Sequence, residues 1–305
     1  MSVLPTGTGG RSWPWTAAAT AIVALLLLPF VPLVLASAAE GYFHPQVLPA
    51  RWSTRAWGIV LGRDAATWPA LRDTVGIAVA VTVISLVVAV PAGRVLGTRA
   101  FRGRRTVELL LLAPILVPTI AVAIGLHVVF IRLGLAGGVV GVVLVHLIPA
   151  TPYVVLLSAG VFANVDLELE SQARSLGASW WRAMLHVTLP LVAPGLAVAA
   201  LLGFLVSWGQ YALTLVIGGG RVITLPILLF ASAAGGDASV TAATALVHGF
   251  PAVVLLIASA RLLEGWAGAG RLRAGRLRAG RLRAGRSGAD APSVDRASAD
   301  LRGVS

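Results

Sequence analysis

The chain contains 305 residues, of which 57% are hydrophobic and only 12% are charged. Soluble domains carry roughly 25% charged residues, so this composition excludes an ordinary soluble globule and indicates an integral membrane protein. The sequence contains no cysteine, which excludes disulfides, cysteine-ligated zinc and thiol chemistry. It also contains no lysine, so the chain cannot form a P-loop, and any ATP-driven activity requires an ATPase on another chain.

Six apolar stretches are long enough to cross a bilayer as helices, since the hydrocarbon core needs about 20 residues. They cover residues 17–36, 74–96, 108–130, 137–160, 191–217 and 240–260. We therefore expect an all-α integral membrane protein with about six transmembrane helices. Proline occurs inside several stretches and indicates either helices kinked around a pathway or the ordinary proline content of membrane helices.

These stretches divide the chain into three parts. A cytoplasmic N-terminal segment at 1–16 precedes the transmembrane domain at 17–265, and residues 266–305 form an Arg-rich cytoplasmic tail. The first stretch has a secretory signal peptide as its alternative, because Ala36-Ser37-Ala38 resembles a cleavage site. We expect a retained helix, since the apolar run exceeds the ~7–15 residues typical of such peptides.

Arginine is distributed unevenly between the two sides of this six-span arrangement. It concentrates on the side of the termini, in the loop at 99–105 and in the tail, where Gly-Arg-Leu-Arg-Ala repeats from Gly270. The positive-inside rule therefore predicts cytoplasmic termini. The tail carries much of the net charge of +12, so that charge does not indicate a nucleic-acid-binding core. The repeat is either a disordered extension or a segment that adheres to anionic lipid headgroups.

The loop at 161–190 has the pattern of two short amphipathic helices. Asp166 is suited to cap the first helix, and the acidic residues that follow favour the positive end of its dipole. Gly177 is suited to end this helix in a left-handed turn. We expect the second helix to end at 188–190, which reads Thr-Leu-Pro. Such a helix–turn–helix on the membrane surface is suited to dock into a groove on a soluble partner.

At these residues the sequence resembles a known family. The runs at 172–178 (QARSLGA) and 188–195 (TLPLVAPG) resemble the EAA loop of ABC-transporter permease subunits. The runs at 207–211, 213–220 and 222–226 resemble the branch that imports spermidine and putrescine. The resemblance extends over nearly the whole chain except the Arg-rich tail.

The EAA-like loop departs from the family motif at its acidic residue. Where the family has Glu-Ala-Ala, this chain has Ser171-Gln172-Ala173. The preceding Glu170 either replaces the motif's acid or does not, because one residue turns a helical side chain by about 100°. The resemblance implies that the loop carries the helix that couples the permease to its ATPase. The residues implied in coupling are Glu170, Ala173, Arg174, Leu176, Gly177 and Ala178. Arg174 either pairs with the ATPase or stays solvated.

The resemblance also implies an architecture, a location and a set of partners. It implies a type I ABC importer permease in the bacterial cytoplasmic (inner) membrane, with both termini inside the cell. The implied partners are cytoplasmic ABC ATPase subunits, a second permease, a periplasmic or lipid-anchored substrate-binding protein and membrane lipid. A heterodimer of permeases is favoured over a homodimer, because the polyamine branch pairs two different permeases. No catalytic site, metal or cofactor is expected in this chain, since ATP and Mg belong to the ATPase, and no nucleic acid is expected.

Polar side chains in the fifth stretch are the candidate substrate pathway, because polar groups at membrane depth usually face the bundle interior or a water-filled cavity. The candidates are Ser207, Trp208, Gln210, Tyr211 and Thr214, four of which follow the i, i+3, i+4, i+7 spacing of one helix face. A polyamine passing this stripe would meet aromatic ring faces and an amide oxygen. The alternative is a helix–helix contact sealed by hydrogen bonds.

The leading interpretation is thus a permease subunit that imports a small solute, with a polyamine as first candidate. Permeases of the same superfamily for thiamine, iron or phosphonate are alternatives. A standalone secondary carrier normally needs ionisable residues within spans and internal repeats, and the sequence shows neither. A membrane enzyme would need a nucleophile–base set, which is also absent from the sequence. His127, His146 and His248 lie far apart in sequence, so we expect packing roles for them.

Overall fold

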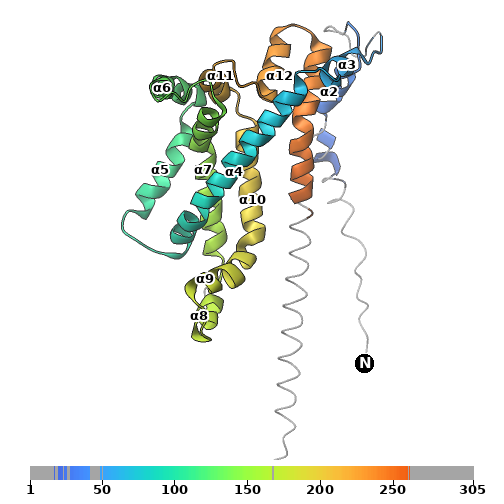
Figure 1. Ribbon diagram of the computed structural model, residues 1–305. Coiled ribbons are helices and arrows are strands. Elements are labelled where there is room, and N and C mark those ends of the chain that lie inside the picture. The colour runs from blue at the N-terminus through green and yellow to red at the C-terminus, as the bar shows by residue number, and fades with distance from the viewer. Residues whose placement is uncertain are drawn as a thin grey trace, which may run out of the picture. The chain divides into compact units, whose positions relative to one another are not determined.

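The computed structural model describes residues 17, 20–22, 24–25, 28–41, 49, 51–166, 168–259 and 261, so the segment 1–16 and the tail 266–305 lie outside it. The chain divides into two compact units, Met1–Leu256 and Ile257–Ser305, and the architecture below is that of the first. Figure 1 shows its helices. They are α2 (Phe30–Ser37), α3 (Arg55–Leu61), α4 (Thr67–Thr98), α5 (Arg104–Leu116), α6 (Thr119–Arg132), α7 (Val139–Ala163), α8 (Glu168–Ser175), α9 (Trp180–Ala183), the π-helical turn η1 (Met184–Thr188), α10 (Leu189–Trp208), α11 (Ala212–Gly218) and α12 (Leu225–Ala234), followed by a helix over Ala238–Ser259.

The regular structure of the described residues consists of helices, joined by turns and loops, with one isolated β-bridge between Ala39 and Trp52. Four of its helices are long and apolar enough to cross a membrane, namely Thr67–Thr98, Val139–Ala163, Trp180–Trp208 and Ala238–Ser259. The all-α membrane class and the second, fourth and sixth predicted stretches are thereby confirmed. The first stretch, 17–36, lies only partly in the described residues, where α2 covers its last part.

The third predicted stretch forms two sharply bent helices and not a single kinked helix. α5 ends at Leu116, α6 begins at Thr119, and the two helices are bent by 96°. Pro118 explains the break, because it has no N–H for the preceding turn and favours an extended residue before it. Val117 has that conformation, with φ −82° and ψ 132°. The prediction of a single helix over 108–130 is therefore wrong.

The second helix of the 161–190 loop does not end where the sequence predicts. α9 continues through η1 into α10, so that Trp180–Trp208 is one continuous helix. A π-turn shifts the register of the backbone hydrogen bonds. Pro190 then falls in the first turn of α10, where a missing N–H is tolerated. The predicted stop at 188–190 is therefore wrong.

The fifth predicted stretch, 191–217, is broken near its far end. α10 ends at Trp208, residues 209–211 are not helical, and α11 begins at Ala212. Gly209 closes α10, as its high backbone freedom favours the end of a helix over the interior. The polar stripe predicted on one face of this helix therefore does not exist. α12, which follows α11, was not predicted from the sequence.

The three long helices α4, α7 and α10 pack against one another, and glycine occurs where they approach most closely. A Cβ atom on Gly93 of α4 would lie 2.6 Å from the Cβ of Ser158 on α7. A Cβ atom on Gly203 of α10 would lie 2.6 Å from Cγ2 of Val154 on α7. Small residues let membrane helices approach closely enough for strong van der Waals contact. A buried cluster of Ala89, Leu96, Val154, Val155 and Ala199 joins the same three helices.

Shorter elements gather at the two opposite ends of these long helices (Figure 1). α8 and α9 lie at one end, which also holds the loop at 99–103 between α4 and α5. α3, α6, α11 and α12 lie at the other end. The EAA-like loop and the Arg-rich loop at 99–105 therefore share one end, as the positive-inside assignment requires.

Candidate functional site

The segment after α7 folds as the predicted helix and glycine turn. The Oδ1 atom of Asp166 accepts a hydrogen bond of 2.9 Å from the backbone N–H of Glu168, which confirms the predicted cap. Gly177 has a φ of +92°, a left-handed conformation that strongly favours glycine. The N–H of Ala178 donates to the carbonyl of Ala173 at 3.1 Å and closes this end of α8.

One face of this segment is open to solvent and carries two large apolar side chains. Leu176 is 89% exposed and Trp181 is 66% exposed. A groove of about 560 Å³ runs along α8 and is lined by Glu168, Ser171, Gln172, Ser175 and Leu176. Of the other residues implied in coupling, Arg174 and Gly177 are exposed, and Ala173 and Ala178 are half-buried. Exposed apolar surface of this kind marks a contact site.

Glu170 lies on the opposite side of α8 and faces α4. Its carboxylate accepts hydrogen bonds of 2.8 and 2.9 Å from the Arg94 guanidinium and one of 2.8 Å from the Thr188 hydroxyl. Burial alone would raise the pKa of this carboxyl, but the hydrogen bonds from Arg94 and Thr188 outweigh it and the pKa is lowered. Glu170 is therefore ionised and buried against α4. The expectation that it docks on the ATPase with the rest of the loop is wrong, because its side chain does not lie on the exposed face.

The contact of Arg94 with the loop was not predicted, although the sequence contains a signal for it. Arg94 is the one charged residue in the apolar stretch 74–96. A charge in such a stretch requires a partner, because an unpaired ion at membrane depth is costly. Its partner Glu170 lies 76 residues away, beyond the reach of any local spacing argument.

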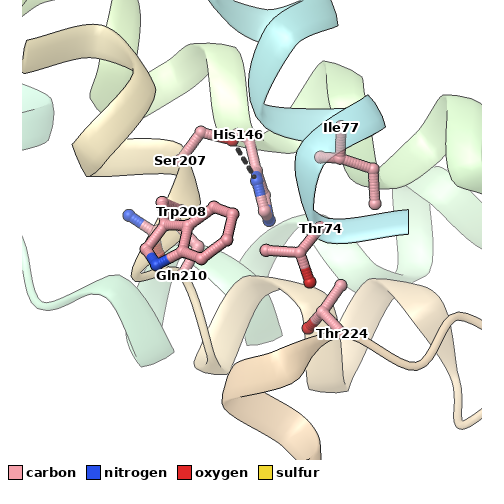
Figure 2. A pocket seen from close by; sticks show the side chains of 7 residues that line it. All are labelled: Thr74, Ile77, His146, Ser207, Trp208, Gln210 and Thr224. Carbon is pink, nitrogen blue, oxygen red and sulfur yellow. Dashed lines mark hydrogen bonds between the residues drawn. The ribbon is translucent and has the colours of Figure 1, made fainter. Parts of the chain in front are cut away.

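Three of the five predicted pathway residues, Ser207, Trp208 and Gln210, line a narrow crevice where α10 ends (Figure 2), and Tyr211 and Thr214 do not. In this conformation it is closed, with about 0 Å³ open to water, and it is lined by Thr74, Ile77, His146, Ser207, Trp208, Gln210 and Thr224. Ser207 and Trp208 come from α10 and Gln210 from the break after it. The hydroxyl of Thr224 is buried without a hydrogen-bond partner among the described residues. The crevice therefore presents neutral hydroxyl and amide groups.

His146 joins two of the predicted residues across the break. Its Nδ1 lies 2.9 Å from Oγ of Ser207, and its Nε2 lies 2.9 Å from Oγ1 of Thr214 (Figure 2 draws the first bond). The ring is buried at 1% exposure. Ser207 and Thr214 thus meet through a histidine on α7 and not by sharing a helix face. The described residues contain no cluster of His, Cys, Asp or Glu suited to a metal.

The two aromatic candidates pack on neighbouring rings. Trp208 stacks on Phe204 and on His248, each with ring centroids 5.5 Å apart, and its Nε1 donates to the His248 carbonyl at 3.1 Å. Tyr211 stacks on Phe230 at 4.0 Å. In this conformation both rings therefore serve packing between helices, which matches the alternative interpretation of the stripe more closely than a cation-binding role does.

Comparison with known proteins identifies relatives of this chain. The sequence model of a family described as "Binding-protein-dependent transport system inner membrane component" matches residues 89–266. The molybdenum transport system permease protein ModB of Mycobacterium tuberculosis is 30% identical over 226 residues, which cover 68% of this chain and 83% of that protein. The putrescine transport system permease protein PotI of Escherichia coli K12 is 27% identical over 225 residues, which cover 68% and 77%.

A solved structure shares the fold. It is a bacterial ABC transporter involved in the import of the acidic polysaccharide alginate, matched with a TM-score of 0.63 at 20% sequence identity. The match covers 84% of this chain and 99% of the solved chain. The helical arrangement described above is therefore that of an ABC importer permease. Molybdenum, putrescine and alginate, named for these three proteins, are chemically unlike one another.

Proposed function

Because the chain belongs to the family of binding-protein-dependent transport system inner membrane components, we propose that it moves a small solute inward by alternating access, with α8 and α9 docked on the ATPase. Family membership makes it a multi-pass membrane permease subunit of an ABC importer. It also implies an ATPase and a substrate-binding protein as partners. The proposal adds the docking surface, the pathway, the solute and the orientation.

The exposure of Leu176 beside the Gly177 turn carries the docking proposal. Burying a leucine side chain stabilises by about 1.5–3 kcal/mol, yet Leu176 is 89% exposed. Trp181 and Leu185 extend the exposed apolar surface onto α9 and η1. A groove on the ATPase would bury this surface, with the exposed charge of Arg174 at its polar rim. The turn at Gly177 fixes the angle at which the two short helices meet such a groove.

The orientation follows from the shared end of the EAA-like loop and the Arg-rich loop. We place this end in the cytoplasm, because arginine in short loops is retained there. The opposite end then faces outward and carries the exposed rings of Trp52 and Trp68, at 63% and 47% exposure. These rings are suited either to the membrane interface or to contact with the substrate-binding protein.

The crevice at the end of α10 is the proposed pathway element of this subunit. Its neutral hydroxyl and amide oxygens can accept hydrogen bonds from an ammonium group, although they bind it only weakly. We propose a polyamine such as spermidine or putrescine as the solute, supported by the likeness of residues 207–226 to polyamine permeases and by the relative PotI. Specificity then lies mainly in the binding protein. The likeness to ModB supports another solute of the same superfamily as the second candidate.

The second permease of the complex is proposed to be a different chain. The support is the polyamine branch, in which two different permeases form the pair. Residues of α5 and α6 such as Leu116 (80% exposed) and Ile124 (63% exposed) leave apolar surface for lipid or for this second permease.

Co-purification tests the docking surface. The complete transporter is expressed with Leu176→Glu in this chain, and the ATPase recovered with the permease is measured. We expect at least a tenfold loss of bound ATPase, because a carboxylate would be buried in an apolar contact. Leu133→Glu is the matched control, since Leu133 is 65% exposed and precedes α7 at the opposite end. Equal ATPase recovery with Leu176→Glu and with the wild type would contradict the docking proposal.

A further inference from the structure

Arg94 connects one transmembrane helix to three consecutive elements at the proposed cytoplasmic end. It lies near the end of α4 and donates two hydrogen bonds to Glu170 of α8. Its guanidinium lies 5.4 Å from the ring centroid of Trp180 in α9, within cation–π range. It also donates to the sulfur of Met184 in η1. The side chain of Arg94 thus contacts one residue in each of α8, α9 and η1.

Glu170 completes this connection. Besides Arg94, it accepts the hydroxyl proton of Thr188, the last residue before α10. The carboxylate therefore ties α8 to the ends of two membrane-spanning helices, α4 and α10. The side chains of Arg94 and Glu170 are 19% and 8% exposed, so water screens their attraction only weakly. A planar guanidinium and a carboxylate joined in this way also fix each other's direction, which a lysine would not do.

The remainder of α8 is less buried than Glu170. Among the residues of α8, Glu170 is the only buried one. Most of its neighbours line the exposed groove or face solvent, Ala173 is half-buried, and Leu169 lies beside residues of α7 and α10. A displacement of α8 by a docked partner can therefore pass to the membrane helices through the buried Glu170 as well as through the backbone at the two ends of α8 and through Leu169, which lies near Val161 and Leu191. Of these routes, Glu170 is the one that reaches α4.

We propose that Arg94 and Glu170 are positioning residues for energy coupling, which transmit a displacement of α8 to α4 and α10. The proposal rests on the proposed function, in which an ATPase moves α8. It separates two roles within the EAA-like loop. The exposed face around Leu176 receives the motion, and the buried pair behind it conveys the motion to the transmembrane helices.

The test is solute uptake per ATP hydrolysed in proteoliposomes that contain the complete transporter and its binding protein, with radiolabelled putrescine as the probe. If putrescine is not taken up, the solute bound to the purified binding protein is identified and used. We expect Glu170→Gln and Arg94→Gln each to lower uptake per ATP at least tenfold, while the ATPase stays bound. We expect the double variant Arg94→Glu, Glu170→Arg, which exchanges the two charges, to recover at least part of the uptake per ATP hydrolysed. Glu108→Gln is the matched control, because the ion pair that Glu108 makes among the described residues is with Arg104 of its own helix, α5.

Each outcome bears on the proposal. Unchanged uptake per ATP in both single variants overturns it, and so does a loss of uptake that only parallels loss of bound ATPase, since that pattern marks a structural role. If the single variants do not accumulate in membranes, the exchanged pair decides. A coupled exchanged pair supports the proposal, and an uncoupled or unfolded one overturns it. If the wild-type complex shows no ATP-dependent uptake, the proposed function fails. If the wild-type complex takes up solute and the variants match its uptake per ATP, the proposed function stands and this inference alone fails.

Discussion

The Nε2 atom of His146 and the Oγ1 atom of Thr214 lie 2.9 Å apart, although 68 residues separate them in the chain. With the second bond to Ser207, the imidazole holds α11 to the end of α10 across the break at 209–211. In a neutral imidazole one nitrogen donates and the other accepts, so a single histidine can satisfy both hydroxyls. The broken end of α10 is thus fixed in place by a residue of α7.

Replacing His146 by alanine tests this clamp. We expect a loss of about 2 kcal/mol in the free energy of unfolding, because two interhelical hydrogen bonds of about 1 kcal/mol each disappear. The measurement is a denaturation titration in mixed detergent micelles. His146→Asn serves as the comparison, since its amide can retain one of the two bonds and should lose less. An alanine variant as stable as the wild type would show that the clamp is dispensable.

Gly93 provides a test of the contact between α4 and α7. Gly93→Ala would place a Cβ atom 2.6 Å from Ser158 Cβ and 2.9 Å from the backbone nitrogen of Ala159. Backbone cannot swing aside, so the helices must separate, and we expect a destabilisation of about 1–3 kcal/mol. Gly76→Ala on the same helix is the control, because its Cβ meets nothing within 4 Å. That change should be neutral or stabilise by up to about 1 kcal/mol, as alanine favours helix. The same micellar titration compares the two, and equal effects would refute the close contact.

Gly177 provides a test of the turn in the docking surface. Gly177→Val forces a β-branched residue to a φ of +92°, so the turn must rearrange and the angle between α8 and α9 change. We expect ATP hydrolysis to continue while uptake falls, because the docking surface no longer presents its two helices together. Gly103→Val is the matched control, since Gly103 also has a positive φ, of +89°, and open space around it. The measurement is uptake per ATP, and equal ratios in the two variants would contradict a special role for this turn.

The pair of Arg55 and Asp237 makes stability at the outer end depend on pH. The hydrogen bond from Arg55 lowers the pKa of Asp237, and bonds of 3.1 Å from the N–H groups of Ser239 and Val240 add to this effect. Since the folded-state pKa lies below the unfolded one, this contribution is fully present above the unfolded pKa. It is lost as the pH falls through the lowered pKa.

The corresponding variant is Asp237→Asn. We expect it to be less stable than the wild type at pH 7. The difference begins to close below about pH 4, where the carboxyl of the unfolded chain takes up a proton, and it is lost as the pH falls through the lowered pKa of the folded state. Thermal unfolding in detergent across this pH range measures the difference. Asp237→Ala should lose more than Asn at every pH, because it also removes the cap of the helix that follows. A stability difference that grows on acidification would contradict a stabilising role for the ionised Asp237.

The sequence predicted some elements well because their determinants are local. The apolar runs within α4 and α7 are longer than any soluble helix requires, and Gly177 ends a short amphipathic pattern at the expected place. The break between α5 and α6 was harder, because a proline in a membrane helix either kinks it or breaks it. Neighbouring helices decide between these outcomes, and spacing along the chain does not contain that information.

In the site, too, local sequence signals were predicted and long-range contacts were not. Ser207 and Thr214 do come together, but the reason is His146 on another helix and not their shared periodicity. Glu170 looked like a docking residue from its position beside the motif, yet its contacts with Arg94 place it on the inner side of α8. Long-range pairs of this kind depend on the packing of α4 against the loop, which no single-sequence pattern reports.

The most direct test of the central claim is solute uptake into proteoliposomes with the components added one at a time. We predict that this permease, with its partner permease, accumulates solute only when the ATPase, ATP and the substrate-binding protein are all present. Accumulation by vesicles that contain this chain alone, without ATPase or ATP, would contradict it.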